Sequence, residues 1–318
     1  YTKELIRKSF EDGLKKSLPR TIVEDDEIMS KFSVEYEISE PAAYAVTALE
    51  QSGFKPKDEN EKYLYGIFDF GGGTTDFDFG VWRGTSDDEY DLYNCDYVLE
   101  CFGADSDVRL GGENILEMLA YNVFKDNKTM ASEKKIACAL PVDQMPFLGG
   151  EHLINNSQSA NRNLTLLKEA LRPLWEQHDN WKEKYCKGNK KTENKLNDFH
   201  NEEEFINLQI DSILSNLQDE EEFINLQMYD FNGNAVENCK FNIDTQKLIE
   251  LIKQRINKGV EAFFECMEKT ILSNRSAQCA SEKIYIFLAG NSCKSVFVKE
   301  IFEKMIEKYN NEYAKYGK

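Results

Sequence analysis

Long apolar segments are missing from this sequence, in which no stretch of eighteen or more apolar residues occurs. A helix that spans a bilayer needs about 20 consecutive, mostly apolar residues. The N-terminal region also lacks the short apolar core and small-residue cleavage site of a secretory signal peptide. We therefore expect no membrane partner and a cytoplasmic location.

Basic residues and histidine are scarce as well. The 318 residues include 57 Asp and Glu against 39 Lys and Arg, with three histidines, and the formal net charge is -18. Proteins that bind nucleic acids present a basic surface to the phosphates. This charge balance therefore argues against a nucleic-acid partner.

The eight cysteines include no Cys-x-x-Cys pair, and the histidines lie far from any group of cysteines. A zinc site needs such residues at short spacing, and disulfide frameworks belong to short, cysteine-dense secreted chains. We therefore expect reduced, mostly buried thiols and no metal ion held by protein ligands alone.

Apolar spacing predicts an α/β fold over most of the chain. Helical spacing marks residues 2–18, 42–51, 114–124, 245–273 and the segment that starts at 289–292. Alternating or continuous apolar stretches predict strands at 34–38, 63–69, 77–81, 90–101 and 284–288, with a polar turn over 83–89. We expect a five-stranded mixed sheet with flanking helices.

Residues 113–243 differ in texture, with polar helical segments, few glycines and a charged stretch at 187–204. The sequence Glu-Glu-Glu-Phe-Ile-Asn-Leu-Gln occurs twice, at 202–209 and 220–227, and its alternation predicts a half-buried strand in each copy. A single duplication indicates a local strand copy rather than a solenoid, which needs about three or more repeats. We interpret the region as an inserted α+β subdomain.

The most informative motif directly follows an apolar strand: Asp69-Phe70-Gly71-Gly72-Gly73-Thr74-Thr75-Asp76. Three glycines let a backbone turn approach a phosphate and direct its amides toward it. Thr74 adds a hydroxyl. Asp69 suits a hydrated Mg²⁺ ion, which takes one or two carboxylates and keeps several waters. The alternative interpretation is a plain glycine-rich hairpin.

This motif resembles the second phosphate loop of the DnaK-type, 70-kilodalton heat-shock chaperones, which share a superfamily with actin and the sugar kinases. Other segments resemble further motifs of that family in the same order: Ser39-Glu40-Pro41-Ala42-Ala43, Leu110-Gly111-Gly112-Glu113-Asn114 and Leu288-Ala289-Gly290-Asn291-Ser292. Each of these alone could also be an ordinary helix start or cap.

The resemblance implies roles for these segments. Glu40 would orient water around the metal and the nucleotide. Contacts with the adenosine would come from Gly111, Gly112 and Glu113, and contacts with the adenine and ribose from Gly290, Asn291 and Ser292.

Residues 168–175 are similar to the family's adenine-binding helix, in which a basic pair and a serine surround the base. Arg172 carries over, with Lys168 as a second candidate, whereas Trp175 departs from the family pattern. Lys294 lies in the loop where the family presents an arginine that stacks on adenine, and lysine lacks the planar guanidinium. We therefore expect weaker adenine recognition than in the chaperones.

The resemblance implies a ribonuclease-H-like, actin-type ATPase lobe formed by residues 1–112 and 244–318, with the inserted subdomain at 113–243. ATP or ADP and Mg²⁺ would be its cofactors, with Asp69, Glu40 and Thr74 at catalytic positions. The nucleotide-contacting residues of the glycine loop would be Gly71, Gly72, Gly73, Thr75 and Asp76.

The family's first phosphate loop and its catalytic lysine are not found in this sequence. We therefore expect the ATP-binding second lobe of a molecular chaperone, nearly inactive alone, with a first lobe of the same protein as partner. A co-chaperone or exchange factor is expected at the insert. Two other classes stay open: an actin-like filament or scaffold protein whose assembly the nucleotide controls, and a degenerate module that binds nucleotide without hydrolysing it.

Overall fold

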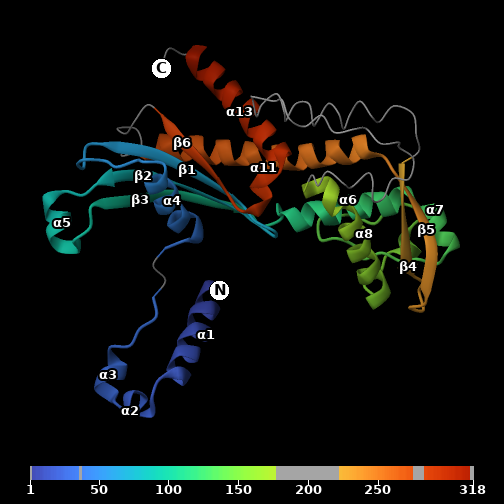
Figure 1. Cartoon of the computed structure of the whole chain (residues 1–318), viewed down its shortest axis with the longest axis horizontal. Coiled ribbons are helices and arrows are strands. Elements are labelled where there is room, and N and C mark those ends of the chain that lie inside the picture. Colours follow the sequence, from blue (N-terminus) through green and yellow to red (C-terminus); the bar gives the residue numbers. More distant parts are fainter. Residues whose placement is uncertain (1, 36–37, 177–221, 275–282, 316–318) are drawn as a thin grey trace, which may run out of the picture.

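The computed structural model describes residues 2–35, 38–176, 222–274 and 283–315. It has a mixed α/β fold, in which helices flank a four-stranded mixed sheet of order β3-β2-β1-β6 (Figure 1). The strands are β1 (Lys62–Phe70), β2 (Thr75–Gly84), β3 (Tyr97–Asp107) and β6 (Ile284–Ala289). β1, β2 and β3 form an antiparallel meander, whereas β6 runs parallel to β1.

Both faces of this sheet are covered, because β1 and β2 carry apolar side chains on alternate faces. Phe68, Phe77 and Phe79 point toward α11 (Thr245–Ser273), which together with α13 (Val296–Lys315) covers one face. Tyr65 and Ile67 point toward α4 (Glu40–Gln51) on the other face. The expected helix over 245–273 is thus confirmed.

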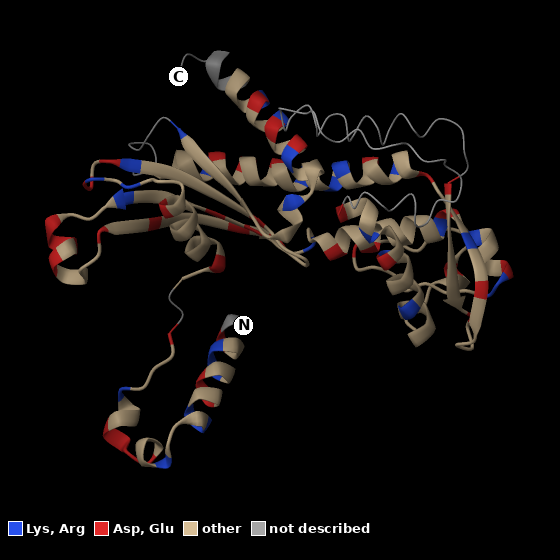
Figure 2. Cartoon of the chain, viewed as in Figure 1, with Lys and Arg blue, Asp and Glu red and all other residues tan. Residues whose placement is uncertain are grey.

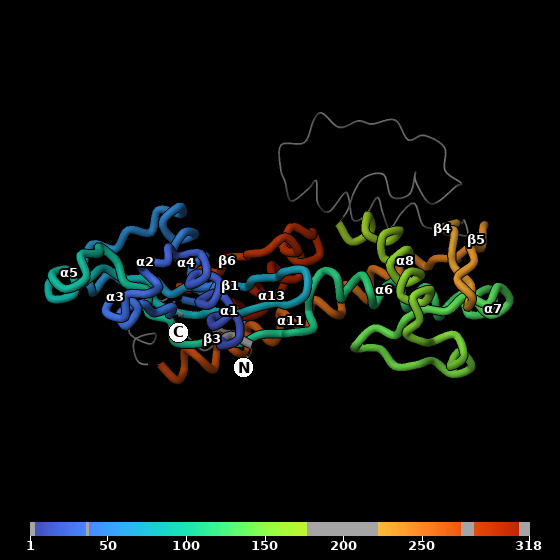
Figure 3. Tube along the Cα trace, turned by 90° about the horizontal axis from the view of Figure 1, so that it is seen from below, coloured from blue at the N-terminus to red at the C-terminus, as the bar shows by residue number. Residues whose placement is uncertain are grey.

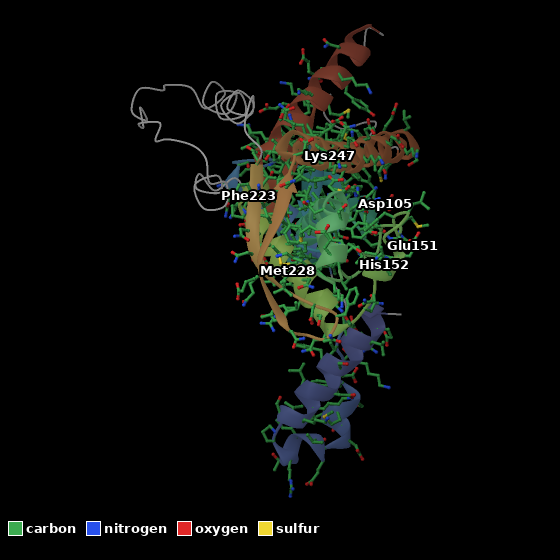
Figure 4. The ribbon with its side chains drawn as sticks, turned by 90° about the vertical axis from the view of Figure 1, so that its right-hand side faces the viewer. Asp105, Glu151, His152, Phe223, Met228 and Lys247 are labelled. Carbon is green, nitrogen blue, oxygen red and sulfur yellow. The ribbon has the colours of Figure 1, made fainter. Side chains whose placement is uncertain are left out.

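A second group of elements lies at the far end of α11 from the sheet (Figures 1 and 3). It comprises α6 (Gly112–Asp126), α7 (Lys128–Glu133), the short 3-10 turn Glu151–Leu153, α8 (Gln158–Glu176) and the hairpin of β4 (Glu222–Tyr229) and β5 (Ala235–Ile243). Asn163 of α8 joins helix to hairpin, because its side chain binds both the carbonyl (2.8 Å) and the amide (2.9 Å) of Tyr229. Met228 on β4 is fully buried among these helices (Figure 4).

The N-terminal helices lie apart from the sheet, as Figures 1 and 4 show. They are α1 (Thr2–Ser17), α2 (Arg20–Val23) and α3 (Asp26–Ser30). The expected helix over 2–18 is confirmed. Its apolar side chains Leu5, Ile6 and Phe10 are each more than half exposed.

Two of the predicted strands, at 34–38 and 90–101, differ from the structure. The described part of 34–38 is in no strand, and 36–37 lie outside the described residues, so the main sheet has four described strands rather than the expected five.

The second difference concerns 83–101, where a turn over 83–89 and a strand over 90–101 were expected and the strand is confirmed only from Tyr97. α5 (Asp87–Tyr93) begins here, and β3 follows only from Tyr97. Ser86 accepts a hydrogen bond from the Glu89 amide, and the Glu89 carboxylate accepts one from the Ser86 amide, which is a capping box that starts a helix. Arg83 reinforces it through a 2.8 Å ion pair with Glu89.

The sequence repeat is seen in part. The second copy enters β4, with Ile224 buried and Asn225 exposed, as its alternation predicted. The first copy and the charged stretch at 187–204 lie outside the described residues. The last helix does not start at 289–292 as expected. A 3-10 turn, Asn291–Lys294, occupies that place, and α13 begins at Val296.

The described cysteines are unpaired, with Cys138 and Cys239 buried and Cys101 exposed. Acidic and basic residues are interspersed along α11 and α13 (Figure 2). Among the helices within the described ranges, none combines the length and apolar character that crossing a bilayer demands.

Candidate functional site

A four-residue turn, Gly71 to Thr74, joins β1 to β2 at the end of the sheet nearest α6. The Gly71 amide closes the turn by donating to the Thr74 carbonyl (2.9 Å). Thr75 is buried and anchors the turn, since its hydroxyl donates to the Leu110 carbonyl (2.6 Å). The Thr74 hydroxyl lies 3.2 Å from Asp76 Oδ2, on the exposed side.

Gly72 and Gly73 form the exposed crest of this turn. A Cβ atom at either position would meet nothing within 4 Å, and neither residue has a positive φ. The amides of Gly72, Gly73 and Thr74 make no hydrogen bond within the described part of the chain. Neither local conformation nor packing therefore requires glycine at 72 and 73. The turn leaves these three backbone N–H groups able to donate to a ligand.

The N-terminus of α6 docks on the inner side of the turn. The Gly112 amide donates to the Gly71 carbonyl (3.1 Å) and the Glu113 amide to the Gly72 carbonyl (2.8 Å). Gly111 is buried, and a Cβ there would lie 2.2 Å from Gly72 O. Close approach of α6 to the turn thus depends on Gly111.

The loop after β6 meets the same turn from the other side. The Ser292 hydroxyl donates to the Gly71 carbonyl (2.9 Å). Gly290 has φ +84°, and a Cβ there would lie 2.3 Å from Phe70 O and 2.7 Å from Asp69 Oδ1. The fold therefore brings three motifs from distant parts of the chain together around Gly71.

A cavity of about 280 Å³ opens between the turn, α6, α8 and this loop. Seven residues expected from the sequence line it: Gly72, Gly112, Glu113, Arg172, Asn291, Ser292 and Lys294. Three that the sequence analysis missed line it too: Trp175, Glu176 and Ser295. Trp175 and Glu176 follow Arg172 by three and four positions, so helical spacing places them on its face and could have indicated them.

Charged pairs hold the α8 wall of the cavity. Arg172 lies 2.7 Å from Glu113 and 2.8 Å from Glu169. Hydrogen bonds from Arg172 and then Lys168 hold the pKa of the Glu113 carboxyl below its ordinary value. Lys168 pairs with Glu113 (2.9 Å) and Glu117 (3.1 Å) and does not line the cavity, so it supports the wall rather than facing a ligand.

Lys294 is exposed and forms no ion pair within the ranges that the structure describes. It lies between the cavity and a second, more open hollow of about 400 Å³, which Tyr44 and Gly290 also line. Its ammonium group is available to a ligand in either hollow.

An acidic group lies beside the turn. Burial at the end of β1 raises the pKa of Asp69, and the neighbouring carboxylates Glu40 and Asp76 raise it further. No lysine or arginine of the described segments forms an ion pair with Asp69. A half-buried carboxylate with acidic neighbours and no basic partner suits a cation.

Over the residues described here, no cluster of three or more His, Cys, Asp or Glu side chains has the geometry of a metal site. Mg²⁺ commonly binds through one or two carboxylates, waters and substrate phosphates. Asp69 fits that pattern with Glu40 nearby, because such a site needs no larger set of protein ligands.

A scan against protein-family models found no match for this chain, and a search of the curated proteins found none either. The function is therefore inferred from the site itself. On a mixed α/β fold, it combines an exposed glycine turn, an acidic residue at a strand end and an adjoining cavity.

Proposed function

We propose that this chain is an ATP-binding second lobe, of the actin-type fold, in a chaperone ATPase similar to the 70-kilodalton heat-shock family. The observation that carries the proposal is the crest at Gly72 and Gly73. The fold itself has room for side chains there, so their absence is best explained by a ligand that approaches the backbone. Consecutive free amides in such a turn suit a phosphate.

The phosphates of ATP or ADP would lie on the crest, bound by the amides of Gly72, Gly73 and Thr74 and by the Thr74 hydroxyl. The Thr75 hydroxyl is buried and already donates a hydrogen bond to the Leu110 carbonyl, so its role is to hold the turn. Asp69 would hold Mg²⁺ through water, and Glu40 would direct solvent around it. The ion would supply charge neutralisation at the phosphates, the main requirement of phosphoryl transfer.

The nucleoside would occupy the adjoining cavity. Its volume of about 280 Å³ lies near the lower end of small-molecule sites, roughly 300–1,000 Å³, and suits a nucleoside better than a whole nucleotide. Gly112 and Glu113 would contact it from α6, Arg172 from α8, and Asn291, Ser292 and Lys294 from the loop after β6.

A first lobe would complete the site and allow hydrolysis to drive a conformational cycle. The exposed apolar side chains of α1 support a further packing partner, because a helix with one apolar face usually buries it. We expect little ATP turnover by this chain alone. Appreciable turnover that Asp69→Asn abolishes would contradict this two-lobe interpretation.

Titration calorimetry with ADP or ATP tests nucleotide binding directly. With Mg²⁺ present, Asp69→Asn should weaken nucleotide affinity by about tenfold or more, since hydrogen bonds to a charged group contribute roughly 1.5–3 kcal/mol. With EDTA, the variant and the parent chain should bind equally. Asp88→Asn on exposed α5 is the matched control and should change neither affinity.

The pH dependence sharpens this test. Because the folded-state pKa of Asp69 is raised above 3.8, its carboxylate becomes protonated, and Mg²⁺-dependent affinity declines, at a higher pH than for an ordinary aspartate. Asp69→Asn should remove that dependence. An affinity that Mg²⁺ does not change, or a parent chain that binds no nucleotide, would refute the proposed site.

Replacing the two cationic side chains of the cavity tests adenine recognition. Lys294→Ala should lower ATP affinity by about three- to tenfold, the range of one hydrogen bond, without loss of stability because Lys294 is exposed and forms no ion pair with another described residue. Arg172→Ala should lower it further, since it also releases Glu113. Lys299→Ala, in the first turn of α13 and outside the cavity lining, is the control and should leave ATP affinity unchanged. Unchanged ATP affinity in the Lys294 and Arg172 double variant would rule out their role.

A further inference from the structure

Ser295 has a buried hydroxyl group at the edge of the cavity. The residue is 8% exposed, lines the cavity and directly precedes α13. Its Oγ forms no hydrogen bond with any described residue. A serine at this position usually caps the helix through its side chain. Here the backbone carbonyl accepts from the Val298 amide (3.1 Å), and the hydroxyl remains unused.

Trp175 of α8 also lines the cavity. It is 4% exposed, and the Phe70 ring lies against it with centroids 6.0 Å apart. A Cβ at Gly112 would lie 3.2 Å from Trp175 Nε1, so the absence of a side chain at Gly112 leaves room for the indole edge. The indole N–H has no hydrogen-bond acceptor among the described residues.

The charges that line the cavity balance. Glu113 and Glu176 contribute two carboxylates, and Arg172 and Lys294 contribute two cations. A neutral nucleoside fits such a lining better than a phosphate group does. An apolar indole and a buried hydroxyl without a described partner in the same lining suit an aromatic base that carries hydrogen-bonding atoms.

We propose that Ser295 and Trp175 are specificity-determining residues for a purine nucleoside: the Ser295 hydroxyl hydrogen-bonds to it, and the Trp175 indole packs against its base. This inference rests on the proposed function, which places the phosphates on the glycine turn. It adds Ser295 and Trp175 to the residues that would bind the base. Base recognition in this chain would therefore differ from that in the chaperones, where an arginine stacks on adenine.

Ser295→Ala is the decisive variant, because it should separate binding from stability. Affinity for ADP with Mg²⁺ and for adenosine should each fall about three- to tenfold by calorimetry, the range of one lost hydrogen bond. The melting temperature should stay the same or rise, since the substitution removes a buried hydroxyl that forms no hydrogen bond with the described residues. Ser273→Ala, at the exposed end of α11, should leave ADP affinity unchanged.

Trp175 is tested by fluorescence in a chain with Trp82→Phe and Trp181→Phe, in which Trp175 is the remaining tryptophan. Adding ADP or adenosine should change its emission, whereas inorganic phosphate should not. UDP should bind at least about tenfold more weakly than ADP, because a pyrimidine leaves much of the indole uncovered.

The outcomes distinguish this inference from the proposed function. A parent chain that binds neither ADP nor adenosine would refute both. A parent chain that binds ADP, together with a Ser295→Ala variant of equal affinity, would overturn the role of Ser295 and leave the nucleotide site intact. Equal affinity for UDP and ADP, or Trp175 emission that does not respond to bound nucleotide, would overturn the assignment of Trp175.

Discussion

Gly111→Ala should abolish nucleotide binding and lower the free energy of unfolding by about 3 kcal/mol, near the upper end for overpacking a tight site. The new Cβ would lie 2.2 Å from Gly72 O and 2.5 Å from the backbone of Gly73. These neighbours are backbone atoms, so they cannot rotate away as a side chain can. Relief requires the turn and α6 to separate, which breaks the bonds from the Gly112 and Glu113 amides.

Gly72→Ala is the matched control for stability, because it adds the same methyl group to the residue that Gly111 contacts. Its Cβ would meet nothing within 4 Å, so stability should change by less than about 0.5 kcal/mol, as for an ordinary surface position. ADP affinity should nevertheless fall by about tenfold or more, because the methyl group would occupy the crest where the phosphates are proposed to lie. Urea denaturation and calorimetry on both variants provide the measurements. Unaltered ADP affinity in Gly72→Ala would contradict the phosphate assignment, and wild-type stability in Gly111→Ala would contradict the packing argument.

Phe263→Ala should lower the free energy of unfolding by about 3–5 kcal/mol, the usual cost of removing a buried aromatic ring. Phe263 is fully buried on α11, and its ring contacts Phe68, Phe77 and Phe79 of the sheet. The surrounding aromatic side chains come from both strands and helices, so the space cannot close without moving the sheet relative to α11.

Guanidinium denaturation followed by circular dichroism measures this loss, with Leu92→Ala as the control. Leu92 is 71% exposed on α5, and its replacement should cost no more than about 0.5 kcal/mol. A loss below about 1 kcal/mol for Phe263→Ala would mean that α11 does not anchor the sheet as described.

Much of the fold was predictable because the relevant signals are local. The alternation along β1 and β2 and the helical spacing of residues 245–273 depend on neighbours within a few positions, and the structure agrees with them. The helix at Asp87–Tyr93 is also encoded locally, in the capping box of Ser86 and Glu89, although the apolar pattern predicts a turn over 83–89 and a strand from Tyr90. The described part of 34–38 shows the converse, since it belongs to no strand although the segment alternates in polarity.

The glycine motif and its neighbours could be recognised as site candidates from residue types and order alone. Residue type and order did not predict the position of Lys168, whose side chain forms ion pairs with Glu113 and Glu117 and does not line the cavity. The sequence did not indicate Ser295 as a binding residue, since a serine directly before a helix is usually an N-cap. Only the structure shows that its hydroxyl is buried, lacks a hydrogen-bond partner within the described ranges and lies beside the cavity.

The helical and strand periodicity, the excess of acidic residues and the three glycines between two aspartates can all be read from the order of the residues. Which of these residues come into contact depends on how the helices and strands pack. Ser292 binds the Gly71 carbonyl across 221 positions of sequence because β6 pairs in parallel with β1, and Gly112 reaches the same carbonyl because Gly111 lets α6 approach. Periodicity reflects interactions over one or two turns of chain, whereas this cavity arises from packing between segments that no short-range spacing relates.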